Sequence, residues 1–210
     1  MVDHLRRFRA TVAFAVRLAL AITLVAALRP SIATANTFGA VVCDTSLASQ
    51  CVADNGVHQW YTIQVASSID TAMNWVDTNV FDPVVGVTML ENSFDVADLH
   101  VYDGTYGTNG FRAWITCNLG AEYGGSGENR WCKAQKISFN NGSYPGEYNL
   151  SAKRKFVACH EVGHSLGLHH PTNADSVSCM RDLALGSPIA AYDARTNLTQ
   201  HDHDHLEDQY

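Results

Sequence analysis

The sequence predicts an α+β fold in which a mixed sheet packs on two helices. Two observations predict it. Short segments rich in β-formers alternate with apolar stretches at helical spacing, in the order strand, helix, several strands, long helix. Apolar residues make up 46% of the 210 residues, which is enough for one domain with a buried core.

The first 35 residues have the features of a secretory signal peptide. Arg6, Arg7 and Arg9 lie before the apolar run LALAITLVAAL at 18–28, and Ala33-Thr34-Ala35 offers a cleavage site. The run is too short to cross a bilayer, which takes about 20 apolar residues. We therefore expect 1–35 to be removed and no stable membrane anchor to remain.

The remaining chain is acidic. Removing 1–35 takes five arginines and one aspartate from 14 basic and 21 acidic residues, leaving nine and 20, a formal net charge of −11. Binding phosphates needs a basic face, so this balance argues against a nucleic-acid partner. It suits a soluble protein outside the cell, and we expect a secreted monomer.

Six cysteines lie beyond the leader: Cys43, Cys51, Cys117, Cys132, Cys159 and Cys179. An even number in an exported chain predicts three disulfides, although six cysteines allow fifteen pairings. Pairing of nearest neighbours is our expectation, which gives bonds 43–51, 117–132 and 159–179. Zinc ligation by cysteine would need C-x₂₋₄-C spacing, which is absent.

The first elements follow an irregular arm at 36–57. The segment HQWYTIQV at 58–65 alternates and is rich in β-formers, so it predicts a strand. Apolar residues recur at helical spacing over 67–80, with Ser67 or Ser68 as N-cap. Asp82-Pro83 is expected to end this helix.

Four further strands are expected before the second helix, at 84–90, 98–103, 111–118 and 133–140. The glycine-rich segments between them predict a turn at 103–110 and a mobile loop at 121–130. Ser151 is the expected N-cap of a long helix that runs to Gly167.

This long helix carries the stretch CHEVGHSLGLHHP at 159–171. His160 and His164 are four residues apart, so they project from one helix face, one turn apart, and can reach one zinc ion. Glu161 can reach a water on the metal without occupying a coordination position. The spacing therefore predicts the zinc site of a hydrolase.

A third ligand is expected beyond the helix. Gly167 can end the helix in left-handed backbone, so that the chain turns back and His170 meets the ion, leaving His169 as the spare histidine. The pattern H-E-x-x-H-x-x-G-x-x-H, followed by Met180, resembles the metzincin clan of zinc endopeptidases. HEVGHSLGLHH is most similar to the matrixins, and His170-Pro171 is similar to the serralysins.

The resemblance implies a metzincin-like domain over 58–210. Such a domain has a twisted, mostly parallel sheet with an edge strand, packed on two long helices and followed by a methionine turn and a C-terminal helix. Met180 would lie beneath the metal without binding it. The segment 196–210 looks like the C-terminal helix, with Thr199 as N-cap. A peptide substrate would pair with the edge strand, for which 111–118 is the candidate.

Several family features are absent from the sequence. No PRCG-type cysteine-switch segment precedes the domain. No calcium-binding glycine-rich repeat occurs, so we expect one catalytic zinc ion, and nothing in the sequence supports a calcium site. Arg181 and Asp182 follow Met180 where a serralysin has a tyrosine ligand, although Tyr192 could line the substrate pocket. The HDHDH run at 201–205 is expected to be a solvated helix face in which His201 and His205 lie on the same side.

The leading hypothesis is a secreted zinc endopeptidase in which Glu161 is the general base for an attacking water. Two alternatives stay open. One is a catalytically silent secreted module that uses zinc for stability or binding. The other is a zinc amidase acting on cell-wall peptides. Whether 36–57 is an inhibitory pro-segment also stays open.

Overall fold

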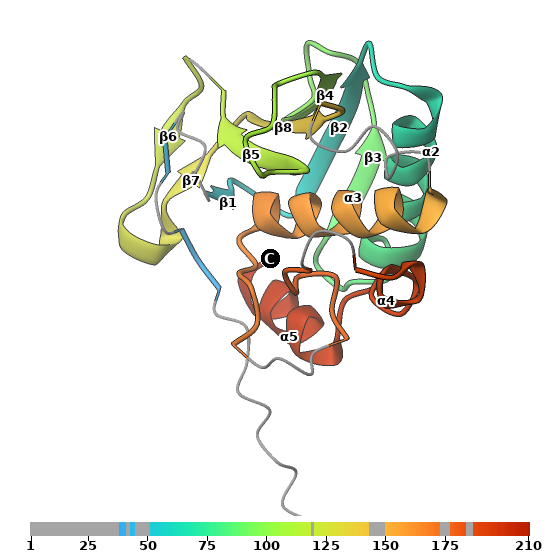
Figure 1. The fold of residues 1–210 in the computed structure, drawn as a ribbon. Coiled ribbons are helices and arrows are strands. Elements are labelled where there is room, and N and C mark those ends of the chain that lie inside the picture. The colour runs from blue at the N-terminus through green and yellow to red at the C-terminus, as the bar shows by residue number, and fades with distance from the viewer. Residues whose placement is uncertain are drawn as a thin grey trace, which may run out of the picture. The chain divides into compact units, whose positions relative to one another are not determined.

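A five-stranded sheet lies at the centre of the domain in the computed structural model (Figure 1). The structure describes residues 38–40, 43–44, 51–118, 120–142, 150–172, 177–183 and 187–210. The sheet order is β3-β2-β4-β8-β5. These strands are β2 (Val57–Ile63), β3 (Thr88–Glu91), β4 (Leu99–Gly104), β5 (Ala113–Cys117) and β8 (Gln135–Asn140).

The sheet is mostly parallel, as the resemblance implied. The strands β3, β2, β4 and β8 pair in parallel, whereas β5 runs antiparallel to β8, with Ala113 opposite Phe139. The strand expected at 111–118 therefore lies at an edge of the sheet. No other described strand pairs with the outer side of β5.

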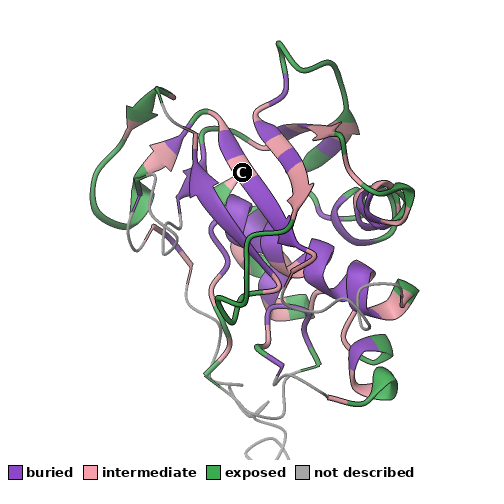
Figure 2. Cartoon of the chain, turned by 45° about the horizontal axis from the view of Figure 1, so that its top comes forward, coloured by how far each residue is buried: buried purple, intermediate pink, exposed green. Residues whose placement is uncertain are grey.

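The helices α2 (Ser67–Val76) and α3 (Ser151–Leu166) lie against each other and share one apolar core with the strands. The periodic residues of α2 are buried as expected, namely Ile69, Ala72, Met73 and Val76. A π-helical turn, η1 (Asp77–Phe81), continues α2 and buries Val80 and Phe81. Figure 2 shows that burial is concentrated in the central strands and in α3.

Neither of the two serine N-caps is observed. Ala66 and Leu150 are the extended residues that precede α2 and α3, and neither provides a side-chain cap. Ser67 and Ser151 are the first residues of their helices, one position after the N-cap. A side chain caps a helix from the N-cap position, so these hydroxyls do not serve as caps. The third N-cap is confirmed, because Thr199 caps α5 (Gln200–Gln209) in a capping box with Asp202.

The strand expected at 84–90 begins only at Thr88. Val84 and Val87 are buried, but they belong to a turn in which the Val84 N–H donates to Phe81 and the Val87 N–H donates to Val84. Gly86 has a φ of +86°, which favours glycine and breaks the extended backbone. An apolar run alone could not distinguish this buried turn from a strand.

A second, small sheet was not expected from the sequence. It has the order β1-β7-β6, from β1 (Val52–Ala53), β6 (Tyr123–Gly124) and β7 (Trp131–Cys132), with a short 3₁₀ turn η2 (Gly127–Asn129) between β6 and β7. The arm at 36–57 and the loop at 121–130 therefore contain ordered pairings. Two disulfides, Cys43–Cys51 and Cys117–Cys132, form a buried cluster here.

All three expected disulfides are present, the third being Cys159–Cys179. No helix within the described ranges is long and apolar enough to cross a membrane. The leader expected at 1–35 lies outside the described residues.

Candidate metal centre

Helix α3 ends where the sequence predicted. Gly167 is its C-cap, with a φ of +103°, and its N–H bonds back to the carbonyls of Gly163 and His164. An added Cβ at Gly167 would lie 2.9 Å from the ring of Phe38, so a side chain here would force this ring to shift, in addition to the cost of left-handed backbone. The chain turns back at this residue and places His170 beside the helix.

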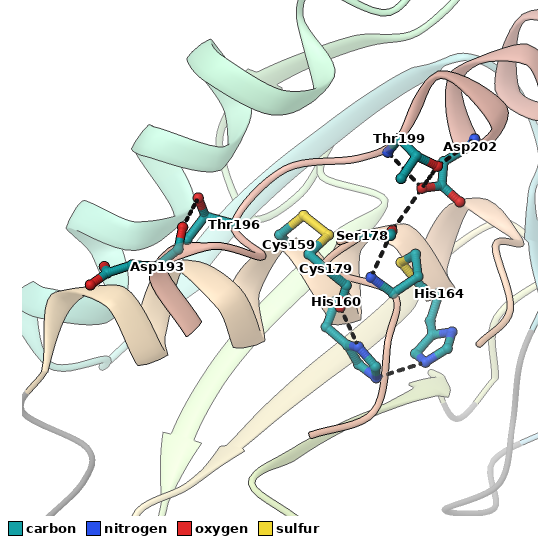
Figure 3. Close-up of a disulfide and its surroundings, with 10 residues drawn as sticks. Cys159, His160, His164, Ser178, Cys179, Asp193, Thr196, Thr199 and Asp202 are labelled. Carbon is teal, nitrogen blue, oxygen red and sulfur yellow. Dashed lines mark hydrogen bonds between the residues drawn. A yellow bond between two sulfur atoms is a disulfide. The ribbon is translucent and has the colours of Figure 1, made fainter. Parts of the chain in front are cut away.

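Three histidine side chains meet at one point. The Nε2 atoms of His160 and His164 are 3.1 Å apart, and each lies 3.0 Å from the Nε2 of His170. Figure 3 shows the rings of His160 and His164 extending from α3 toward each other. The structure thus brings together all three histidines that the sequence singled out.

Backbone carbonyls orient two of these rings. The Nδ1 of His160 lies 2.8 Å from the carbonyl oxygen of Cys179, and the Nδ1 of His164 lies 2.7 Å from that of Leu168. A carbonyl can only accept, so each Nδ1 carries the proton and each Nε2 presents a lone pair. Two lone pairs at this distance cannot hydrogen-bond each other.

This donor set fits zinc. Three imidazole nitrogens are a common protein ligand set for zinc, at Zn–N distances of about 2.0–2.1 Å, which in a tetrahedron separates the nitrogens by about 3.3 Å. The observed separations of 3.0–3.1 Å are close to that value. A cation at the centre would also remove the repulsion between the lone pairs.

Burial keeps the histidines in the form that binds metal. It lowers the pKa of His160 to about 4, and it lowers the pKa of His164 well below the ordinary value. The pKa of His170 is lowered too, mainly by burial, while the nearby Asp182 acts in the opposite direction. The three imidazoles are therefore neutral at pH 7.

Glu161 lies in α3 beside the first histidine, and its residue is 5% exposed. Burial, with a smaller contribution from the charge of Asp182, raises the pKa of Glu161 to about 8. A divalent cation at the histidines would act in the opposite direction, because it favours the carboxylate. Glu161 can therefore exist in both protonation states near neutral pH, as a proton carrier must.

Met180 packs against helix α3. It is fully buried, and a Cβ added to Gly163 of α3 would lie 2.2 Å from the Met180 sulfur, so the sulfur packs directly on the helix backbone. The Cys159–Cys179 disulfide joins α3 to this turn next to His160 (Figure 3). The same residue, Cys179, thus holds both the helix and the His160 ring.

A buried carboxylate, which the sequence analysis did not single out, supports the methionine turn from α5. Asp202 accepts from the hydroxyl of Ser178 at 2.7 Å, and that hydroxyl also accepts from the N–H of Met180 at 3.0 Å (Figure 3). Asp202 also accepts from the N–H of Thr199. The T-x-x-D spacing signals the helix cap, but nothing in the sequence signals the contact with Ser178.

A second polar network joins α3 to the sheet, and the sequence did not predict it either. Ser165, next to His164, donates to the Val162 carbonyl, so its oxygen accepts from the Nε2 of His58 at 2.8 Å. The side chain of Gln135 donates to the Ser165 carbonyl at 2.6 Å. The turn of α3 that carries His164 is thereby tied to β2 and β8.

The other histidines that the structure describes lie outside the cluster. His169 is half-buried, and its Nε2 approaches the carbonyl oxygen of Gly39 in the arm. His201 and His205 share one face of α5 as expected, with ring centroids 4.4 Å apart, and His205 stacks on Phe38. Tyr192, in α4 (Ile189–Asp193), is fully buried, and its hydroxyl accepts from the Nη2 of Arg112 at 2.6 Å.

Comparison with known proteins agrees with this geometry. The family model described as Matrixin matches residues 60–210. No curated protein matches the chain.

Proposed function

The chain belongs to the matrixin family of zinc-dependent metallopeptidases, and we propose that it is a secreted endopeptidase whose zinc is bound by His160, His164 and His170. In this proposal Glu161 is the general base. One observation carries it: the three Nε2 atoms converge within 3.0–3.1 Å of one another, and Glu161, the residue after His160 in α3, is buried.

When bound, zinc supplies Lewis-acid chemistry, which polarises a peptide carbonyl and makes a water molecule acidic enough to be deprotonated near pH 7. Glu161 accepts the proton of the water that attacks the carbonyl carbon. It then donates this proton to the leaving amine nitrogen as the C–N bond breaks. Each turnover thus returns Glu161 to its carboxylate form.

The proposed substrate is an extended peptide that pairs with β5. The outer side of β5 has no strand partner among the described residues, although the Cys117 N–H at its end donates to the Asp44 carbonyl at 3.0 Å. We propose that the backbone groups nearer the start of β5 form the ladder with a substrate. A protein chain in extended form is the substrate class that this recognition favours, because backbone hydrogen bonds are independent of side chains.

Secretion is proposed from the cysteines and the leader. Three disulfides without a free cysteine fit an oxidising compartment. The segment 1–35 has the composition of a signal peptide. Sequencing the N-terminus of the protein recovered from culture medium tests this, and a chain that begins at Asn36 supports it.

The catalytic assignment predicts that Glu161→Gln binds zinc as wild type does but cleaves casein at least about 100-fold more slowly, because general acid–base catalysis contributes about 10²–10⁴-fold. Zinc content and casein cleavage are measured on the same preparations. The matched control is Glu122→Gln, since the Glu122 carboxylate is exposed and forms an exposed ion pair with Lys133. Activity of Glu161→Gln above a few per cent of wild type would rule out the general-base role.

The same assay separates the alternative functions. A zinc-stabilised module without activity would bind zinc and cleave nothing. A cell-wall amidase would hydrolyse cell-wall peptides and leave casein and gelatin intact. Cleavage of casein or gelatin that a zinc-chelating hydroxamate blocks supports the endopeptidase.

A further inference from the structure

Helix α5 carries a second pair of histidines, whose arrangement repeats that of the first two histidines of the metal centre. His201 and His205 are four residues apart, so they project from one helix face, one turn apart. His160 and His164 have the same spacing on α3. The ring centroids are 4.4 Å apart in α5 and 4.5 Å apart in α3, and the rings meet edge-on at interplanar angles of 72° and 86°.

The α3 pair shows what this ring geometry allows. Its two Nε2 atoms approach to 3.1 Å, which is close to the separation of two nitrogens that bind one tetrahedral ion. The α5 pair has nearly the same ring separation and angle on the same helical spacing. Its two imidazoles are therefore placed to bind one metal ion together.

Both the backbone and one ring of the α5 pair are held in place. Asp202, the residue after His201, is fully buried, and its carboxylate accepts from the Thr199 N–H at 2.8 Å and from the Ser178 hydroxyl at 2.7 Å. Phe38 stacks on the ring of His205, with centroids 6.0 Å apart and an interplanar angle of 23°. Ligands that are already ordered lose little conformational entropy when they bind a metal.

The surroundings of the pair favour a cation. Both histidines are half-buried, so a metal ion can reach them from solvent. Helix α5 contains no lysine or arginine, and four of its ten residues are acidic, namely Asp202, Asp204, Glu207 and Asp208. Glu207 and Asp208 are exposed in the last turn, where the negative end of the helix dipole disfavours carboxylates. A cation bound beside this turn offsets that repulsion.

The ligand type decides which metal ions fit. Imidazole nitrogens suit zinc, copper and nickel, whereas calcium and magnesium prefer oxygen ligands. Two protein ligands supply about half of the binding free energy of a four-ligand structural zinc site, which corresponds to a Kd on the order of 1–100 μM. The ion is therefore held more weakly here than by three histidines.

We propose that His201 and His205 form a second, weaker site for a divalent transition-metal ion, zinc or copper, on α5. The bound ion crosslinks two successive turns of this helix and stabilises it. Asp202 of the same helix holds the Ser178 hydroxyl, which accepts from the Met180 N–H, so the stabilisation extends to the methionine turn. The site goes beyond the peptidase function and does not depend on it, because it lies on a different helix from the metal centre.

The test is a calorimetric zinc titration of the full chain at pH 7.5, starting from protein that has received one equivalent of zinc. Wild type is expected to bind a further equivalent with a Kd of about 1–100 μM. His201→Ala and His205→Ala each remove one of two ligands, so each is expected to weaken this binding at least about tenfold. The matched control is His203→Ala, because His203 is half-buried in the same helix but lies on another face.

Two further measurements identify the ligands and the effect of the ion. Zinc at ten times the Kd is expected to raise the Tm of wild type by about 3–6 °C more than that of His201→Ala. Copper(II) bound at the second site is expected to show two nitrogen ligands by electron paramagnetic resonance in wild type and one in either variant. His201→Gln and His205→Gln, whose side chains are similar in size, separate the loss of a ligand from a change in the helix.

The inference is overturned if wild type binds no second equivalent, or if the variants at His201 and His205 bind it as tightly as wild type does. A loss of equal size in His203→Ala, or a copper spectrum with oxygen ligands only, would place the ion elsewhere and would also overturn it. Failure of the proposed function gives a different result, because a chain without the three-histidine zinc would still differ from His201→Ala by one weakly bound ion.

Discussion

Each histidine of the cluster takes its position from a different neighbour. The carbonyl of Cys179 orients His160, the carbonyl of Leu168 orients His164, and the left-handed turn at Gly167 brings His170 to the other two. The sequence predicted these three residues because spacing on a helix is a local property. It could not predict the carbonyls, since those contacts depend on how distant segments pack.

At Gly167 we predict that alanine destabilises the fold for two separable reasons. Left-handed backbone costs alanine about 1–2 kcal/mol, and its Cβ would meet the Phe38 ring at 2.9 Å. Gly107→Ala is the control, because Gly107 has a φ of +76° but an added Cβ would meet nothing within 4 Å. Urea unfolding should show a larger loss for Gly167→Ala, with weaker zinc binding for that variant only. Equal losses and unchanged zinc binding would contradict the role assigned to the turn.

At the scale of elements, helix α3 was predictable in its course and its end, whereas its attachment to the sheet was not. A periodic apolar face and a terminal glycine are local signals. The bonds from His58 and Gln135 to Ser165 join residues far apart in the sequence, so no local pattern signals them. The serine N-caps were misplaced by one residue for a related reason, because neighbouring positions at a helix start look alike in sequence.

The pair of His58 and Asp98 predicts a specific pH dependence of the free energy of unfolding. Burial lowers the pKa of His58 to about 4 and raises that of Asp98, whose Oδ1 lies 3.6 Å from the His58 Nδ1, to about 7. Below pH 6.5 the unfolded histidine binds a proton that folded His58 does not, so His58 destabilises the fold as pH falls toward 4. Folded Asp98 keeps a proton that the unfolded chain releases, so its effect has the opposite sign over the same window.

We therefore expect the two contributions to oppose each other in the wild type between pH 4 and 6.5. Asp98→Asn should expose the His58 contribution, so that the free energy of unfolding of this variant falls by up to about 3 kcal/mol as pH falls through this window. His58→Gln should show the reverse slope. Asp95→Asn, at an exposed neighbouring carboxylate, is the control. Unfolding is measured with a chelator present, so that metal binding does not contribute, and parallel slopes in all four proteins would contradict the assignment.

At the scale of the whole molecule, the order of the main strands and helices was predictable from the sequence. Each has its own apolar period, and the histidine pattern marks helix α3. The small sheet was not, since β1, β6 and β7 have two residues each and show no period. The sequence also did not predict that the arm at 36–57 contacts the end of α3. Phe38 forms an antiparallel bridge with Leu168, and the Gly39 N–H donates to the Gly167 carbonyl at 2.9 Å. The arm thus reaches the turn that ends α3.

The central claim is that one zinc ion, held by three histidines, makes this chain a peptidase, and the most direct measurement is a zinc titration of the metal-free protein followed by casein cleavage. We predict that activity rises with zinc up to one equivalent per chain. His164→Ala should lose both tight zinc binding and activity, while His203→Ala, at a half-buried histidine of α5, should retain both. Cleavage by the metal-free wild type, or zinc binding by His164→Ala as tight as that of wild type, would contradict the claim.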